Sequence, residues 1–284
     1  MGTEIMIFGS HVSIRNGYLG AAKKAVANHA SAFQYFPKNP RSLSIKDFDK
    51  EDAKNCNEFC QKHHLQSIAH TPYSTSLTPS GDKQELTIAS LLNDLEIANA
   101  CGSIGVVVHY GSQISQTDPL ASYHLMLAML NGVFRQWDGD CLILLENNAG
   151  TKGALGTTLE ELVQIRNLCD YPEKIGFCLD TCHAFASGLW TGGNTAELIE
   201  KGESLGYFAE LKAIHLNNSK YPTGSKKDRH ANIFYRNGHI HEDQLKEFIT
   251  SPVFIGIPLV LETPDDEGMT HKEEIELLKQ KWEK

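Results

Sequence analysis

The chain has 284 residues, of which 41 % are hydrophobic and 21 % are charged. This length and composition indicate a soluble globular protein with a core large enough for one α/β barrel. The formal net charge of −9 argues mildly against a nucleic-acid partner. That objection loses weight if the protein binds several divalent cations, because their charge would dominate locally.

The sequence indicates neither secretion nor a membrane anchor. Its first residues, MGTEIMIFGSH, are too short and too polar for a signal peptide, and runs such as IGVVV and CLILL are only strand-sized. We therefore expect a cytoplasmic protein. Seven scattered cysteines fit free, mostly buried thiols of a reducing compartment. A metal clip at Cys56/Cys60 or Cys178/Cys182 is the less favoured alternative.

Eight short apolar runs recur along the chain. They are continuous in Val, Ile, Leu and Phe rather than alternating, which is typical of buried parallel strands. The predicted strands are residues 4–10, 32–36, 66–70, 104–109, 141–146, 175–180, 212–216 and 257–262.

Helical patterns lie between these runs. Residues 83–101 carry apolar side chains at helical spacing and stop before Gly102, a C-terminal cap. Another helix opens with Thr158 and Glu161 at capping-box spacing, and a third runs from an Asn194 cap to Gly206.

Eight strand–helix units without a linker predict one domain over residues 1–284, a (β/α)8 TIM barrel. A doubly wound sheet would have fewer strands and a glycine-rich phosphate turn after the first strand, which GSHVSIRNGYLG is not.

Six consecutive predicted strands, the third to the eighth, end in a histidine or an acidic residue. In a barrel these side chains would meet at the C-terminal mouth. Three carboxylates forced together would repel or bind protons unless cations neutralise them, and this N/O ligand set suits zinc or manganese rather than calcium. We therefore predict a multi-metal site. The six residues are His70, His109, Glu146, Asp180, His215 and Glu262.

A further metal position is predicted from three residues outside this set. His183 lies one turn beyond Asp180, so it needs partners of its own. Asp228 and His230, in the loop after the seventh strand, can supply them. Nine ligands are more than one or two metals require.

Several motifs in this order resemble the endonuclease IV family, the trinuclear-zinc apurinic/apyrimidinic endonucleases on an (α/β)8 barrel. The resemblance covers essentially the whole chain. The motifs are GSHVSI, FQYFPKNPR, HTPY (70–73), LENNAG (145–150), CLDTCHAFASG (178–188), IHLNNSK (214–220), DRHANI (228–233) and VLETP (260–264).

The resemblance implies which residues hold each of three zinc ions, one position of which could accept manganese. His70, His109 and Glu146 would hold the first. Glu146 would bridge to a second, shared with Asp180, His215 and Glu262. The third would be held by His183, Asp228 and His230.

The resemblance also implies the reaction. A metal-activated hydroxide would cleave the phosphodiester 5′ to an abasic site in duplex DNA, leaving a 3′-hydroxyl and a 5′-deoxyribose phosphate, and blocked 3′ ends would be trimmed. Glu146 and Glu262 would be the catalytic carboxylates. Whether Glu262 is only a ligand or also orients the nucleophile or acts as its base stays open. No obligate protein partner is implied, and we expect a monomer.

Basic and aromatic residues of the mouth loops are the candidate DNA contacts. Arg41 and Tyr73 match family positions that enter the DNA at the lesion, although packing is an equal alternative for Tyr73. For each lysine the alternative is an ordinary solvated side chain. The remaining candidates are Lys38, Lys220, Lys226, Lys227 and Arg229.

The chain departs from the family pattern at several positions. Ser74 stands where a bulky aliphatic residue usually wedges the duplex, and Asn218 stands where an aspartate is usual. DRHANIFYRNGHI is longer than its usual counterpart, and ASGLWTGG replaces AGYD. None removes a ligand, so we expect these changes to affect duplex distortion and rate before metal binding.

Two other functions fit parts of the pattern. A sugar isomerase or epimerase of the xylose-isomerase-like barrels also gathers acidic residues and histidines at strand ends. It needs one or two metals, however, and would leave His183, Asp228 and His230 idle. A damaged-DNA-binding protein that cleaves poorly is the second alternative, because of the altered wedge at Ser74.

Overall fold

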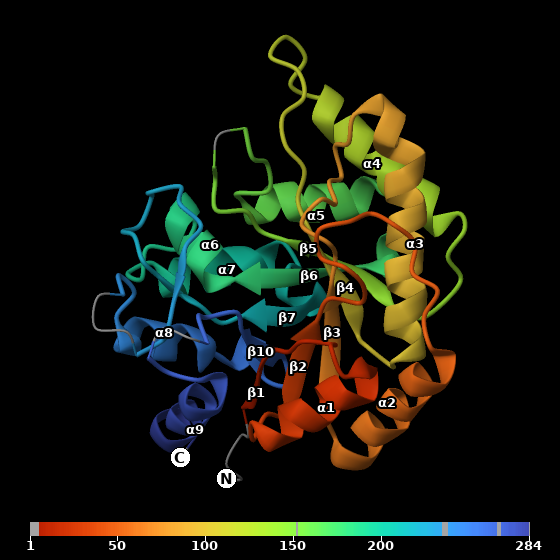
Figure 1. The fold of residues 1–284 in the computed structure, drawn as a ribbon. Coiled ribbons are helices and arrows are strands. Elements are labelled where there is room, and N and C mark those ends of the chain that lie inside the picture. Colours follow the sequence, from red (N-terminus) through yellow and green to blue (C-terminus); the bar gives the residue numbers. More distant parts are fainter. Residues whose placement is uncertain (1–5, 152, 235–237, 266–267, 284) are drawn as a thin grey trace.

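Eight parallel strands close into a barrel in the computed structural model, which describes residues 6–151, 153–234, 238–265 and 268–283 (Figure 1). The order around the barrel is β1-β10-β7-β6-β5-β4-β3-β2, and β2 pairs with β1 to close it. The barrel strands are β1 (Ile7–His11), β2 (Ala32–Tyr35), β3 (Gln66–His70), β4 (Gly105–His109), β5 (Leu142–Glu146), β6 (Ile175–Asp180), β7 (Leu211–His215) and β10 (Pro258–Leu261).

The predicted (β/α)8 barrel is thereby confirmed. Seven of the eight predicted strands agree with the observed ones to within one residue at each end. The first begins later, at Ile7, and continues to His11; residues 4 and 5 of the predicted strand lie outside the described residues. A short antiparallel pair, β8 (Asn218–Ser219) with β9 (His230–Ala231), was not predicted.

Helices surround the barrel on its outside (Figure 1). They are α1 (Gly17–Ala27), α2 (Lys50–His63), α3 (Gln84–Ala100), α4 (Ala121–Phe134), α5 (Leu159–Leu168), α6 (Thr181–Ser187), α7 (Thr195–Ser204), α8 (Glu242–Ile249) and α9 (His271–Trp282). Short 3-10 turns are η1 (Gly81–Lys83), η2 (Pro172–Lys174), η3 (Phe208–Glu210) and η4 (Pro252–Phe254). None of the helices in the described part of the chain is long and apolar enough to cross a bilayer.

The predicted helix ends hold with one exception. Helix α3 stops before Gly102, and the capping box at the start of α5 is formed by Thr158 and Glu161. Asn194 does precede α7, but its side chain does not cap that helix. Its Oδ1 instead accepts a hydrogen bond from the backbone N–H of Thr191, at 2.8 Å.

Two apolar layers support the mouth of the barrel. The larger fills the space between strands and helices, where Trp190, for example, stacks on Phe248 with 4.7 Å between ring centroids. The smaller fills the barrel interior below the strand ends. All seven cysteines are buried and free, as predicted. The interior layer consists of Ile68, Val107, Leu144, Cys178, Ala213 and Val260.

Candidate metal centre

The strand ends bring the predicted ligands together at one mouth of the barrel. Five of the six are the last residues of their strands, and Glu262 directly follows β10. The parallel pairing places the last residues of neighbouring strands side by side. His109 lies opposite Glu146, and Asp180 lies opposite His215. The side chains of Glu146 and Asp180 are almost fully buried. The predicted convergence of these side chains is therefore observed.

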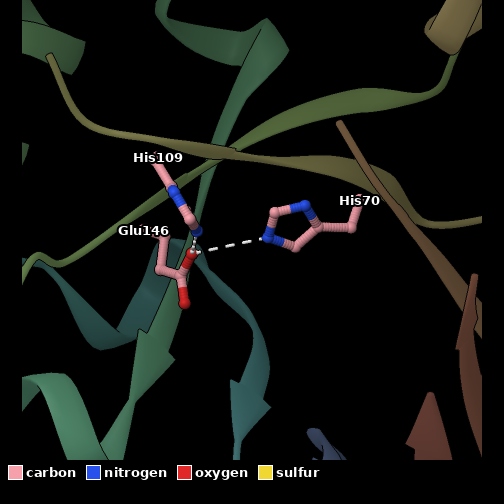
Figure 2. A group of neighbouring side chains, drawn as sticks. All are labelled: His70, His109 and Glu146. Atoms are coloured by element: carbon pink, nitrogen blue, oxygen red, sulfur yellow. Dashed lines mark ion pairs between the residues drawn. The ribbon is translucent and has the colours of Figure 1, made fainter. Parts of the chain in front are cut away.

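The first group consists of His70, His109 and Glu146. Both imidazoles direct Nε2 at the same carboxylate oxygen, Oε2 of Glu146, at 3.8 Å for His70 and 3.1 Å for His109 (Figure 2). Nδ1 of His70 donates to the carbonyl oxygen of Thr71 at 2.8 Å. Since a carbonyl oxygen only accepts, this bond fixes the tautomer that leaves Nε2 of His70 free to bind a metal.

The second group uses the other oxygen of Glu146. Nδ1 of His215 lies 2.7 Å from Oε1 of Glu146 and 3.2 Å from Oε2 of Glu262. It also lies 3.8 Å from Oδ2 of Asp180. One ligand atom from each of these four residues lies within 4.8 Å of the others. Glu146 therefore faces both groups, with one oxygen directed at each.

The third group joins α6 to the loop after β7. Nε2 of His183 lies 3.2 Å from one oxygen of Asp228, and Nε2 of His230 lies 3.1 Å from the other. Nδ1 of His183 donates to the carbonyl of Asn147 at 2.9 Å, which again leaves Nε2 free. Asp180 caps the first turn of α6 by accepting from the N–H of His183 at 2.7 Å. The strand-end aspartate thus serves the second group and also places the histidine of the third.

The electrostatics of these groups call for additional positive charge. Burial would raise the pKa of Glu146, but the charges of His215 and His109 outweigh it and hold that pKa well below its usual range. Asp180 is not compensated in the same way: burial raises its pKa despite the histidines around it. In addition, Oε2 of Glu146 and Nε2 of His230 are buried and form no well-aligned hydrogen bond, although each lies 3.1 Å from an ion-pair partner. Cations bound between the groups would satisfy these atoms.

Two asparagines hold the ligands in place. Oδ1 of Asn147 accepts from the N–H of Asp180 at 2.7 Å, and its amide donates to the carbonyl of Asp180 at 3.1 Å. The amide of Asn217 donates to Oδ2 of Asp180 at 2.8 Å, and its oxygen accepts from the N–H of Glu262 at 3.0 Å. Neither residue was predicted to act at the site. The available signal was their place in LENNAG and IHLNNSK, one and two residues after a strand end.

A cavity of about 390 Å³ opens onto all three groups. The ligand candidates His70, His109, His183, Asp228, His230 and Glu262 contribute to its wall. His11, Phe36 and Tyr73 line it as well, on the side of β1, β2 and β3.

The comparisons with known proteins agree with this geometry. A family model described as a xylose isomerase-like TIM barrel matches residues 22–281. A protein of Symbiobacterium thermophilum called probable endonuclease 4 is 40 % identical over 260 residues, which cover 91 % of this chain and 93 % of that protein. The chain belongs to the endonuclease IV family.

Solved structures are similar to this chain as well. The crystal structure of endonuclease IV from Thermus thermophilus matches this endonuclease IV family member with a TM-score of 0.82 at 28 % identity, covering 96 % of each chain. A D-tagatose 3-epimerase-like protein matches with a TM-score of 0.69 at 22 % identity, covering 97 % of this chain and 96 % of that one. At 22 % identity, the similarity to the epimerase-like protein shows only that the two proteins share a fold.

Tyr73, a predicted DNA-contact residue of this endonuclease IV family member, lines the cavity. Tyr73 is 67 % exposed, and its ring packs edge-on against Phe36 at 5.1 Å between centroids. The backbone N–H of Tyr73 donates to the carbonyl of Pro40 at 2.8 Å, which joins its loop to the loop that carries the exposed Arg41. Ser74, beside Tyr73, is also exposed.

The loop after β7 carries the other candidates. Lys226, Lys227 and Arg229 are exposed, and Lys220 is partly buried. Nζ of Lys227 lies over the ring of Tyr221, 4.3 Å from its centroid.

The predicted phosphate contact of Lys38 is wrong. Its side chain is buried, and Nζ lies 3.1 Å from Oδ1 of the fully buried Asp94 on α3. The same ammonium donates to the carbonyl and the hydroxyl oxygen of Ser90, at 2.7 and 2.8 Å. Lys38 therefore anchors the loop between β2 and α2 from the inside, where a phosphate cannot reach it.

Proposed function

We propose that this protein is a DNA repair endonuclease with three zinc ions per chain. It would hydrolyse the phosphodiester 5′ to an abasic site in duplex DNA, leaving a 3′-hydroxyl and a 5′-deoxyribose phosphate, and would trim blocked 3′ ends. One observation carries the proposal: Glu146 directs one oxygen at each of two ligand groups, with the group of His183, Asp228 and His230 beside them on the same cavity. The relatives called probable endonuclease 4 support it.

The donor chemistry supports zinc. Imidazole nitrogens and carboxylate oxygens are the ligands that zinc accepts, and a fixed tautomer with a free Nε2 is the arrangement found at histidine ligands. We assign the first ion to His70, His109 and Glu146. The second would share Glu146 with Asp180, His215 and Glu262, and the third would take the remaining three residues. One position could accept manganese in place of zinc.

When bound, the ions would supply hydroxide at neutral pH and neutralise charge that develops on the phosphodiester. The buried and the partly exposed carboxylates would have different roles. Glu146 and Asp180 are too deeply buried for a substrate to reach, so they hold the groups in place. The side chain of Glu262 is 19 % exposed and lines the cavity. We therefore assign to Glu262, besides ligation, the orientation of the nucleophile and the acceptance of its proton.

Recognition of DNA would come from the rim. Tyr73 and Arg41 would enter the duplex at the lesion, where a missing base makes it cheaper to open the stack. Contacts to phosphate would come from the loop after β7, and bound cations would offset the negative charge of the chain near the site. We place the enzyme in the cytoplasm as a monomer. The phosphate contacts are assigned to Lys220, Lys226, Lys227 and Arg229.

The two alternatives explain less of the site. A sugar epimerase would have no use for the third group, and the structural likeness to the epimerase-like protein concerns the fold. A protein that binds damaged DNA without cleaving it would have no use for a complete ligand set. Exposed Ser74 bears on how the duplex is distorted and leaves the ligands unchanged.

The test is cleavage of a duplex oligonucleotide that contains one tetrahydrofuran abasic analogue, with metal analysis of the same preparation. We expect a single cut 5′ to the analogue and about three zinc per chain. Absence of cleavage with three metals bound would contradict the nuclease function and favour the binding protein. Absence of cleavage with one or two metals would favour a sugar isomerase.

A matched pair of variants controls for general damage to the protein. Glu262→Gln keeps the size of the side chain and removes its charge at the cavity. Glu247→Gln makes the same change at an exposed position on α8, outside the site. Loss of cleavage in the first variant alone would support the assignment, and equal activity of the two would contradict it.

A further inference from the structure

The buried side-chain amide of Gln34 connects two candidate metal ligands, although Gln34 is not one of the nine predicted ligands. Gln34 lies in β2, a strand that contributes no ligand, and its side chain is fully buried. It is the polar member of the otherwise apolar sequence AFQYF. Its partners come from three other strands: His11 from β1, His215 from β7, and Glu262 directly after β10.

The three hydrogen bonds of Gln34 fix the state of each partner. Its Oε1 lies 2.7 Å from Nε2 of His215, and its Nε2 lies 2.6 Å from Oε1 of Glu262 and 3.2 Å from Nδ1 of His11. A carboxylate oxygen accepts hydrogen bonds, and Oε2 of Glu262 already faces the amide nitrogen of Asn217 at 3.5 Å, so Oε1 accepts from the amide nitrogen of Gln34. The amide nitrogen of Gln34 must therefore face Glu262, and its oxygen must face His215.

This orientation determines which atoms face the second ligand group. Because Oε1 of Gln34 only accepts, it holds a proton on Nε2 of His215, so Nδ1 is the nitrogen left to bind a metal. Nδ1 is the atom that lies 3.2 Å from Oε2 of Glu262 and 2.7 Å from Oε1 of Glu146. Gln34 also occupies Oε1 of Glu262, which leaves Oε2 as the oxygen on the side of the group.

We infer that Gln34 is a positioning residue for the second metal. A single amide selects the Nδ1-coordinating tautomer of His215 and turns Oε2 of Glu262 toward the same point. The inference rests on the proposed metal centre. A glutamine with only a structural role would need hydrogen-bond partners, but their identity would not matter. Here two of the three partners, His215 and Glu262, are candidate ligands of the same metal, and both come from strands that do not neighbour β2.

The test uses two variants of Gln34 and one control. Gln34→Met keeps the length of the side chain and removes all three hydrogen bonds. Gln34→Glu keeps an acceptor for His215 but sets a second carboxylate against Glu262. The control is Tyr35→Phe, which removes a buried hydrogen bond to Ser103 from the next residue of the same strand.

Zinc affinity is measured by competition with a chelator. The tautomer of His215 is read from side-chain 15N chemical shifts of the zinc-loaded protein. For Gln34→Met we expect one zinc to be held about 10–100-fold more weakly, with two unaffected, and a shifted His215 signal. For Gln34→Glu we expect a similar loss of affinity with the Nε2-protonated tautomer retained. Tyr35→Phe should match the wild type in both measurements.

Several results would overturn the inference. Wild-type zinc affinity and an unshifted His215 signal in Gln34→Met would do so, and so would ligation of His215 through Nε2 in the wild type. If Gln34→Met does not fold, Gln34→Glu decides alone, because unchanged affinity there refutes the contact with Glu262. A wild type that cleaves abasic DNA and shows no Gln34 effect refutes only this inference. A wild type that binds no zinc refutes the metal centre as well.

Discussion

The buried pair Lys38–Asp94 allows a direct test of whether a loop lysine supports the fold or binds DNA. The two charged atoms lie 3.1 Å apart, and both side chains are almost fully buried, at 2 % and 0 % exposure. Lys38→Met would leave the Asp94 carboxylate without its cation. Removing one partner of a buried ion pair costs about 3–5 kcal/mol of the free energy of unfolding. At about 2 °C per kcal/mol for a chain of this size, the melting temperature should fall by about 6–10 °C.

The assay combines thermal unfolding with the salt dependence of binding to abasic duplex. Each phosphate contact adds about 0.9 to the slope of log K against log salt concentration. Lys38→Met should leave this slope unchanged. The exposed Lys227→Met should lower the slope by about 0.9 and leave the melting temperature unchanged. The double variant Lys38→Met/Asp94→Leu should recover most of the lost stability, since replacing both charges removes the unpaired one.

The reasoning would be refuted by the opposite pattern. If Lys38→Met melted like the wild type and lowered the salt slope, Lys38 would be a phosphate contact and its buried placement would be wrong. If the double variant were as unstable as Lys38→Met, the lost stability would not come from an unpaired Asp94.

Three further predictions concern the metals and the rim. Glu146→Ala should reduce kcat/KM by about four orders of magnitude or more, because one carboxylate serves two ligand groups and each metal contributes several kcal/mol; near-normal cleavage would exclude a shared carboxylate. Ser74→Leu should tighten binding to abasic duplex in an equilibrium titration, and unchanged affinity would mean that this loop does not enter the DNA. Burial lowers the pKa of His183 and His230, but Asp180 and Asp228 raise it more, to about 9 for His230. In the metal-free protein these raised values contribute stability that is complete below pH 6.5 and lost as the pH rises through about 9. Zinc binds only the deprotonated imidazoles. The increase in melting temperature caused by adding zinc should therefore become larger between pH 6.5 and 9. An increase that does not depend on pH would contradict this prediction.

The convergence of the strand-end side chains was predictable because the barrel repeats. Once each apolar run is taken as a parallel strand, the residue at its end must lie at the mouth, as His70 and Glu146 do. The same logic could not assign a role to Gln34. A polar residue within a strand can face the interior or a helix, and only the closed barrel shows that it meets Glu262, 228 residues away in the sequence.

Loop side chains were harder to predict than strand ends. The sequence places Lys38 in a loop at the mouth of the barrel. It does not show that Asp94, on α3, lies behind that loop and pairs with Lys38. The geometry of β4 sets the direction in which the side chain of His109 points. The side chain of Lys38 is directed by its contact with Asp94, which is distant in the sequence. This difference explains why the predicted convergence of the strand-end side chains is observed, whereas the phosphate contact predicted for Lys38 is wrong.

The third group of candidate ligands depends on structure outside the barrel, close to two positions where we expect departures from the family pattern. His230 is held by the pairing of β9 with β8, where it lies opposite Ser219. The neighbouring Asn218 donates from its amide to the carbonyls of Ile233 and Ile240, at 3.2 and 3.0 Å, and so holds these two residues close to β8. An aspartate has no hydrogen to donate to either carbonyl. Asn218 therefore joins the segment after β9 to β8, the strand that pairs with His230.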